Sequence, residues 1–362
     1  MQAQSIDGSD TTGTVVALND DGNRLVMGGF ATLFVYDGST NNDGTVEWSL
    51  SADLSDSFSS WISAVDITSD GGHIIVSETT EDVTSPDFDA ATEYTVRAFK
   101  YVGSWVQDGS DLVSENPGDG FGASIAISED GSKIVVGAPY GNYVDIIFAV
   151  IGQEWTLRLD GVEDNSFFGS TVSLAADGRF LAVGAPHGKD YQGCAYVIDT
   201  NQKLVVHSFF GSSQGEINGD YFGSTLAFSK DQSVLAVGST AKSDANTYAS
   251  VFLLNSDTDQ YDPISSIQGT GERSRGWSLA LSADGGRMTV GMPYNDEEGT
   301  NSGKTSIYAI ANESLFNVGT FLGAPEDKMG STVSISGDGT VIASGAIGNE
   351  NISARLMKAI PA

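Results

Sequence analysis

The stretch FGASIAISEDGSKIVVGAP, residues 121–139, decides the fold of this chain. It contains a short apolar segment, an Asp-Gly turn and a second, almost wholly apolar segment that ends in Gly-Ala-Pro. The same pattern returns along the chain, in copies that start at residues 12, 61, 121, 168, 222, 275 and 329. Because self-similarity at a regular period is typical of repeat architectures, the chain is interpreted first as a repeat protein.

Each repeat contains four strand-like runs and no sustained helical period. In the third repeat these runs are residues 124–128, 134–137, 144–151 and 155–159, which are rich in β-branched and aromatic residues. Consecutive repeats start 49, 60, 47, 54, 53 and 54 residues apart, near the kelch scale of about 50. We therefore predict an all-β, seven-bladed β-propeller of four-stranded antiparallel blades.

The composition of the first two runs predicts where they lie. Small residues such as Ser124 and Ala126 suit an innermost strand, where the blades converge. The second run is apolar on both faces, as expected for a strand between neighbouring blades. Asp-Gly pairs join the two runs as hairpin turns, and only the fifth repeat departs, with Asp231-Gln232.

The two ends of the chain predict how the ring closes. The last repeat has room for only three strands, at residues 332–336, 341–346 and 353–360. Residues 2–7 precede the first repeat and resemble the fourth strand of the other repeats, so we expect them to complete the last blade. Such closure leaves fewer exposed strand edges. Residues 1–362 are thus expected to form a single propeller domain.

The recurring FG, S-x-DG and VGAP segments resemble the FG-GAP repeat family, which includes the propellers of integrin α subunits. The resemblance implies a propeller that is usually extracellular and serves adhesion or assembly. Integrin-like members hold calcium in an acidic loop between the first two strands. Here that connection is only SEDGSK, AADGRF or SGDGTV, too short to supply six to eight oxygen ligands. The chain resembles the variant that lacks these calcium loops, so no cofactor is expected there.

The charge balance limits the partners. The chain has 48 acidic and 17 basic residues, for a formal net charge of −31. A chain with so few basic residues has no basic patch to neutralise phosphates, so we do not expect it to bind nucleic acid. The longest apolar run, residues 146–151, is too short to span a membrane. The first ten residues have neither the basic nor the apolar region of a signal peptide.

An aspartate recurs two residues before the aromatic position that opens a repeat. The set consists of Asp10, Asp119, Asp220 and Asp327. One interpretation is a ring of carboxylates near the channel that collects a cation or a basic group. The other is a recurrent Asx turn, in which each carboxylate accepts hydrogen bonds from nearby backbone amides.

Two further groups are candidate binding residues. Asn255, Asp257, Asp259 and Asp262 have oxygen spacing like the start of a calcium loop, but they lack its glycine and its distal glutamate, so a solvated hairpin tip is the alternative. The second group is a set of tyrosines expected on one face, where they would form a recognition surface for sugars or peptides or would pack beneath loops. Its members are Tyr140, Tyr143, Tyr191 and Tyr294.

The sequence gives catalysis little support. Its three histidines fall at unrelated repeat positions, and neither a Gly-x-Ser-x-Gly nor a His-Glu-x-x-His motif is present. We expect a rigid, non-enzymatic scaffold that binds another protein or a glycan through one face. The expected setting is the cell surface or the outside of the cell, within a larger assembly. The alternative is a carbohydrate- or metal-binding propeller, and a more remote one is a hydrolase or lyase with its site at the channel mouth.

Overall fold

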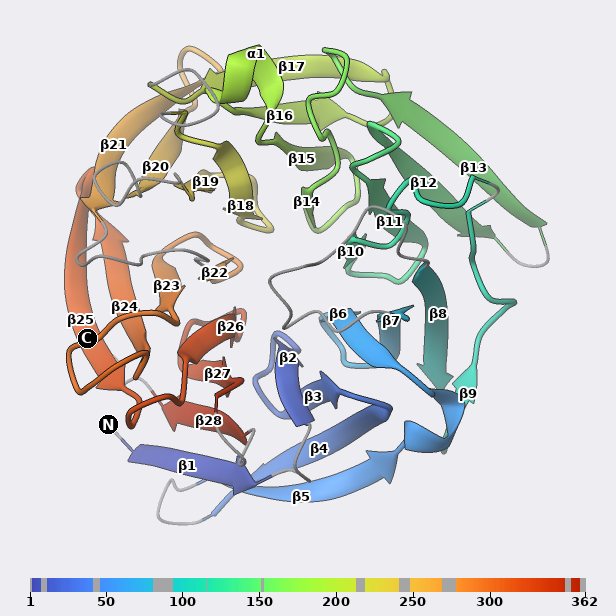
Figure 1. The fold of residues 1–362 in the computed structure, drawn as a ribbon, viewed down its shortest axis with the longest axis vertical. Helices are drawn as coiled ribbons and strands as arrows, with labels where there is room; N and C mark the ends of the chain where they lie inside the picture. The colour runs from blue at the N-terminus through green and yellow to red at the C-terminus, as the bar shows by residue number, and fades with distance from the viewer. Residues whose placement is uncertain are drawn as a thin grey trace.

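In a computed structural model, the chain forms seven four-stranded antiparallel sheets arranged as the blades of a propeller around a central channel (Figure 1). The structure describes residues 2–7, 12–41, 46–80, 94–114, 116–150, 153–212, 219–240, 248–268, 278–348 and 353–358. The predicted seven-bladed, all-β fold is therefore confirmed. Within these residues, no helix is both long and apolar enough to cross a bilayer.

Each blade runs from an innermost strand to an outermost one in chain order, except that the outermost strand of blade 7 comes from the start of the chain. Blade 1 consists of β2 (Thr12–Leu18), β3 (Arg24–Gly29), β4 (Thr32–Thr40) and β5 (Val46–Asp53). Blade 2 consists of β6 (Trp61–Ile67), β7 (His73–Thr79), β8 (Tyr94–Tyr101) and β9 (Trp105–Gln107). Blade 3 consists of β10 (Ser124–Ile127), β11 (Lys133–Ala138), β12 (Tyr143–Val150) and β13 (Gln153–Asp160). Blade 4 consists of β14 (Thr171–Leu174), β15 (Phe180–Ala185), β16 (Cys194–Asp199) and β17 (Leu204–Phe210).

The remaining blades repeat this order. Blade 5 consists of β18 (Phe222–Phe228), β19 (Val234–Ser239), β20 (Tyr248–Asn255) and β21 (Gln260–Gln268). Blade 6 consists of β22 (Ser278–Leu281), β23 (Arg287–Met292), β24 (Lys304–Ala311) and β25 (Ser314–Leu322). Blade 7 consists of β26 (Met329–Ile335), β27 (Val341–Ala346), β28 (Ser353–Lys358) and β1 (Gln2–Asp7). Within the described ranges, the helical segments are η1 (Ser55–Ser57) and α1 (Gly188–Tyr191).

The second strand of each blade is buried on both faces, as its composition predicts. In β15, for example, every residue after Phe180 is buried. Side chains from adjacent blades share one core, as where Val135 of blade 3 packs in the same cluster as Leu181 of blade 4. Burial of these apolar surfaces between the sheets is the main force that holds neighbouring blades together.

The glycine of the VGA segment and the glycine of the FG pair fit against each other across the blade boundary. A Cβ placed on Gly184 of blade 4 would lie 2.1 Å from the carbonyl oxygen of Gly223 in blade 5. Gly137 and Gly169 meet in the same way between blades 3 and 4, also at 2.1 Å. The VGA and FG segments therefore recur together, because the glycine of each lets the backbones of neighbouring blades come close to one another.

Residues 2–7 close the ring, as the sequence predicts. Strand β1 pairs antiparallel with β28 in register, from Gln2 opposite Lys358 to Asp7 opposite Ser353. Ile6 is only 7% exposed and packs in one cluster with Leu356 and with Val16 of blade 1. The first residues of the chain thus join the last blade to the first.

Candidate functional site

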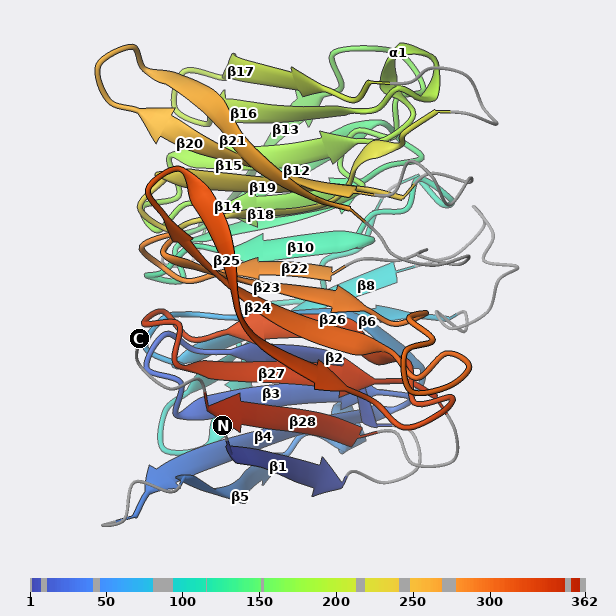
Figure 2. The ribbon, with the colours of Figure 1, turned by 90° about the vertical axis from the view of Figure 1, so that its left-hand side faces the viewer.

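Two faces of the propeller differ in the connections that form them. The hairpin face carries the turns that join the first strand of a blade to the second and the third to the fourth. The opposite face carries the loops that join the second strand to the third and those that lead into the next blade; we call it the long-loop face. In side view, α1 and the loop that contains it lie on this second face (Figure 2).

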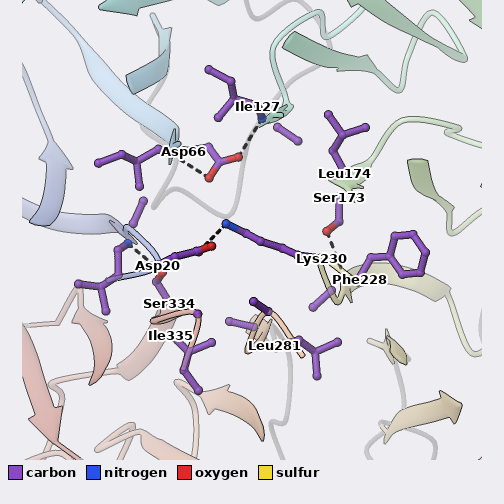
Figure 3. Close-up of a pocket in the computed structure, with 18 of the residues that line it drawn as sticks. Asp20, Asp66, Ile127, Ser173, Leu174, Phe228, Lys230, Leu281, Ser334 and Ile335 are labelled. Carbon is purple, nitrogen blue, oxygen red and sulfur yellow. Dashed lines mark hydrogen bonds and ion pairs between the residues drawn. The ribbon is translucent and has the colours of Figure 1, made fainter. Parts of the chain in front are cut away.

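The innermost strands of all seven blades surround a cavity of about 280 Å³ in the channel, toward the hairpin face (Figure 3). Its wall carries small and branched apolar side chains, as predicted for innermost strands. The charged residues that line it are Asp20, Asp66, Glu129 and Lys230. Acidic groups thus outnumber the single base in the channel.

Backbone hydrogen bonds join the turns of neighbouring blades around this cavity. The N–H of Ala283 donates to the carbonyl oxygen of Gly337 at 2.9 Å, and the N–H of Gly337 donates to that of Asp20 at 2.9 Å. Equivalent bonds of 3.1 to 3.3 Å join four further junctions. The structure describes all seven turns, and the junction between blades 2 and 3 has no such turn-to-turn bond.

Side-chain oxygens on the innermost strands make a second set of contacts between blades. Ser334 of blade 7 accepts the backbone N–H of Leu18 at 2.9 Å, and Ser173 of blade 4 accepts that of Phe228 at 3.2 Å (Figure 3). At the equivalent place in blade 2, Asp66 accepts the N–H of Ile127 at 2.9 Å. A carboxylate therefore does in blade 2 what a serine hydroxyl does in blades 4 and 7.

The environment of Asp66 favours its protonated form. Burial in the channel wall raises the pKa of this carboxyl to about 6, against hydrogen bonds from the backbone of Ile127 and Ile67 that lower it. The positive charge of Lys230 also lowers the pKa, and the negative charge of Asp20 raises it. Asp66 is thus the carboxyl in the channel whose ionisation is held back by desolvation.

Lys230 spans the mouth of the channel at the hairpin face. Its ammonium forms an ion pair with Asp20 of blade 1 (Figure 3). It also donates to the hydroxyl of Ser69 of blade 2 at 2.6 Å. These contacts join blade 5 to two blades that lie across the ring from it. Sequence reasoning missed this arrangement, although the signal was present as a lysine at a turn position that is acidic or small in the other repeats.

Asp119 serves as an anchor within blade 3. Its Oδ1 accepts the N–H of Phe121 at 2.9 Å, which is the Asx-turn geometry. Its Oδ2 accepts the hydroxyl of Tyr143 at 2.5 Å and also that of Ser114. Burial and the bond to Asp119 raise the pKa of Tyr143 to about 12, so this phenol stays protonated.

Asp220 and Asp327 make similar contacts in other blades. The Oδ2 of Asp220 accepts the hydroxyl of Tyr248 at 2.8 Å and that of Ser212 at 2.7 Å. The Oδ2 of Asp327 accepts a bond from the Arg355 guanidinium at 3.0 Å. Each carboxylate bonds within its own blade, so the structure does not bring the aspartates together; Asp10 lies outside the described residues.

The structure separates the four candidate tyrosines. Tyr143 is 4% exposed and lies at the start of β12, beneath the Arg158 guanidinium. Tyr294 is half-buried in the loop after β23 of blade 6. Only Tyr140 and Tyr191 belong to one continuous cluster, and they do so through other rings.

That cluster is an aromatic patch on the long-loop face, formed by α1 and by loops of blades 3, 4 and 5. Phe167 stacks on His187 with ring centroids 3.9 Å apart, and it meets Tyr140 edge-on at 5.3 Å. His187, Tyr191 and Tyr221 lie 4.8 to 5.5 Å from one another. The aromatic patch thus consists of Tyr140, Phe167, His187, Tyr191 and Tyr221.

Three of these aromatic residues have left-handed backbone conformations: Phe167 (φ 58°), Tyr191 (φ 62°) and Tyr221 (φ 53°). Phe167 and Tyr221 directly precede the residue that opens their repeats, where blade 3 has Gly120 (φ 73°) and blade 7 has Lys328 (φ 50°). A left-handed non-glycine residue costs about 1 kcal/mol. The left-handed position recurs from blade to blade, and the doubled aromatics of FFG and YFG were the sequence signal that blades 4 and 5 place a ring there.

The candidate calcium residues form a hairpin tip between β20 and β21. The side-chain oxygen of Asn255 accepts the N–H of Asp257 at 3.0 Å, and its amide donates to Asp262 at 3.0 Å. Asp259 instead lines a cavity of about 190 Å³ between blades 4 and 5, together with Tyr261. Across the described parts of the chain, no three His, Cys, Asp or Glu side chains converge as a metal site.

Comparison with known proteins finds similarity in fold alone. No family model and no curated protein matches the sequence. Among solved structures, the chain is similar to the crystal structure of the β-propeller domain of Cps50 (Swd1) from Myceliophteria thermophila, with a TM-score of 0.68. The two sequences are 14% identical, and the match covers 99% of this chain and 98% of the other. The similarity shows the β-propeller architecture over the length of both chains.

Proposed function

We propose that this chain is a non-enzymatic scaffold that binds a protein partner through its long-loop face, with the aromatic patch as the contact surface. Large, rigid aromatic side chains dominate the energetics of protein interfaces because they bury much area at little cost in conformational entropy. The propeller holds the loops of blades 3, 4 and 5 on fixed strands. Loops on such a scaffold are the usual place for binding residues.

The observation that carries the proposal is the set of strained aromatics. Gly120 occupies one of the equivalent left-handed positions, so glycine is compatible with the fold at this place. Blades 4 and 5 nevertheless place Phe167 and Tyr221 there, and both side chains contact His187. Together with the contact between Tyr140 and Phe167, these rings join loops of blades 3, 4 and 5 into one group, which supports a recognition surface that spans blades.

The resemblance to FG-GAP repeats supports a setting outside the cell or at its surface, in adhesion or in a larger assembly. The net charge of −31 favours a partner with a basic surface, because complementary potentials speed association and disfavour wrong partners. Carbohydrate recognition is the second candidate, because half-buried rings such as Tyr140, Phe167 and Tyr191 can also stack on the apolar faces of sugars, while Tyr221, at 7% exposed, supports them from below.

The test uses glycine variants that remove the aromatic patch without adding strain. In Phe167→Gly/Tyr221→Gly, both side chains are removed at positions where glycine adopts the native φ without a penalty. The matched control is Lys328→Gly, the same change at the equivalent position of blade 7. Thermal melts verify that all three proteins are folded.

Binding is measured in parallel against a protein extract of the native source, by quantitative mass spectrometry, and on a glycan array. The proposal predicts a protein captured by the wild type and by Lys328→Gly, with at least about tenfold less on the double variant. Glycan binding lost in the double variant would favour the second candidate. Equal capture by all three folded proteins would overturn the assignment of this surface.

A further inference from the structure

The mouth of the channel is built around a positive charge. Lys230 is the only base among the residues that line the cavity, where it faces Asp20, Asp66 and Glu129. Its ammonium reaches across the channel to the Asp20 carboxylate of blade 1 (Figure 3). It also contacts the Ser69 hydroxyl of blade 2. The side chain is about one-third exposed, so the contact is reached from solvent at the hairpin face.

Lys230 is a basic residue at a turn position where the other repeats have acidic or small residues. The residue before the turn aspartate is Asp20, Ser69 and Glu129 in blades 1 to 3, and Ala176, Ala283 and Gly337 in blades 4, 6 and 7. The first three provide acceptor oxygens and the others provide space. One side of the channel mouth therefore offers oxygens, and the side chain of Lys230 crosses the mouth to reach them.

We infer that the mouth of the channel is a binding site for a primary ammonium group, which Lys230 fills from within the chain. The carboxylate of Asp20 and the hydroxyl of Ser69 accept two of the three N–H donors that an ammonium carries. A site of this kind recognises charge and N–H donors together, so it excludes quaternary ammonium ions, which have no N–H.

The consequence is that one contact at the mouth of the channel links three blades. The ion pair and the hydrogen bond join residues 210 and 161 positions apart in the sequence. Loss of the ammonium leaves the Asp20 carboxylate without its countercharge beside Asp66, and acidic repulsion then destabilises the ring.

The experiment is a chemical rescue of Lys230→Ala. Removal of the side chain leaves both a free oxygen site and room for methylammonium. We expect a melting temperature several degrees below that of the wild type, which methylammonium chloride restores with half-saturation at about 10 mM or above, the range for so small a ligand. The matched control is Lys230→Met, which removes the charge but fills the space of the lysine stem. Methylammonium should leave its melting temperature unchanged.

Sodium chloride and tetramethylammonium chloride at equal concentration separate specific binding from salt screening. Recovery of Lys230→Ala by methylammonium alone supports the site. Equal recovery with all three salts, equal recovery of Lys230→Met, or no recovery at any concentration overturns it. If Lys230→Ala does not fold when expressed, refolding yield with and without methylammonium provides the same comparison, and a yield that methylammonium does not raise also overturns the site.

Discussion

The Oδ2 of Asp66 accepts the backbone N–H of Ile127 at 2.9 Å and thereby joins blade 2 to blade 3 at the channel wall. Serine makes the corresponding contact in blades 4 and 7, through Ser173 and Ser334. A carboxylate can accept the same hydrogen bond, but when it is ionised its negative charge lies in the channel wall. The contact between blades 2 and 3 therefore depends on a group that can be protonated.

Asp66 should make stability fall as the pH rises from about 4 to about 6. Its pKa is raised to about 6 in the folded state from 3.8, so over this interval the folded protein binds a proton that the unfolded chain releases. The stabilising contribution is complete below pH 4 and lost above pH 6. Asp66→Ser should remove this decline and stabilise the protein at pH 7.5 by about 1 to 2 kcal/mol, since channel water screens part of the effect.

Urea unfolding at several pH values measures the difference between wild type and Asp66→Ser, in which the contributions of other carboxyl groups cancel. Asp20, Glu129 and Lys230 face the same cavity and remain unchanged in both proteins. Asp66→Ala serves as the control that also loses the acceptor for Ile127. A difference independent of pH would contradict the assignment.

Gly184→Ala should destabilise the propeller by about 3 kcal/mol or more. The new Cβ would lie 2.1 Å from the backbone carbonyl oxygen of Gly223, and a backbone atom in a neighbouring blade cannot move aside as a side chain can. Gly103→Ala is the comparison, because a Cβ there meets no atom within 4 Å and only the φ of +98° is unfavourable. That change should cost about 1 kcal/mol. If chemical denaturation showed similar losses of stability for the two variants, the close contact between Gly184 and Gly223 would not explain the destabilisation.

Asp220→Ala should cost about 3 kcal/mol, because the carboxylate is fully buried and its removal leaves the hydroxyls of Ser212 and Tyr248 without their acceptor. Asp257→Ala, at the exposed tip of the β20–β21 hairpin, should change stability by less than about 0.5 kcal/mol. Both are measured by denaturant midpoint. A small effect at Asp220 would favour a binding role for this carboxylate over an anchoring one.

Deletion of residues 1–7 should open the ring. The edge of β28 and the core around Ile6 would be exposed to water, and blade 7 would lose its outermost strand. We expect a melting temperature lower by about 10 °C or more and a concentration-dependent tendency to associate through the free edge. A synthetic peptide of residues 1–9, added in trans, should reverse both effects. If the deleted protein melted at the same temperature as the full-length protein, closure of the ring by residues 2–7 would contribute little to stability.

The sequence by itself determined the architecture. The repeated pattern around residues 121–139 contains alternating strand and turn signals at short range, so the number of blades, the four strands of each and the closing role of residues 2–7 followed from local chemistry. Of the recurring aspartates, Asp119 forms the Asx turn with Phe121, whereas Asp220 and Asp327 bond to other groups of their blades. The strands and turns that repeat in every blade can be predicted from the sequence, because the same local interactions form them each time.

Only the tertiary structure decided which residues from different blades meet. Lys230 reaches Asp20 across 210 residues of sequence, and Phe167 stacks on His187 while Tyr143 turns into the core. The sequence marks Lys230 and Phe167 as departures from the repeat, but it does not show which residues they meet, because that depends on how the blades curve around the channel. The shared pattern of the repeats determines the propeller. The residues that depart from this pattern, such as Lys230, contact residues of other blades only in the folded, closed ring.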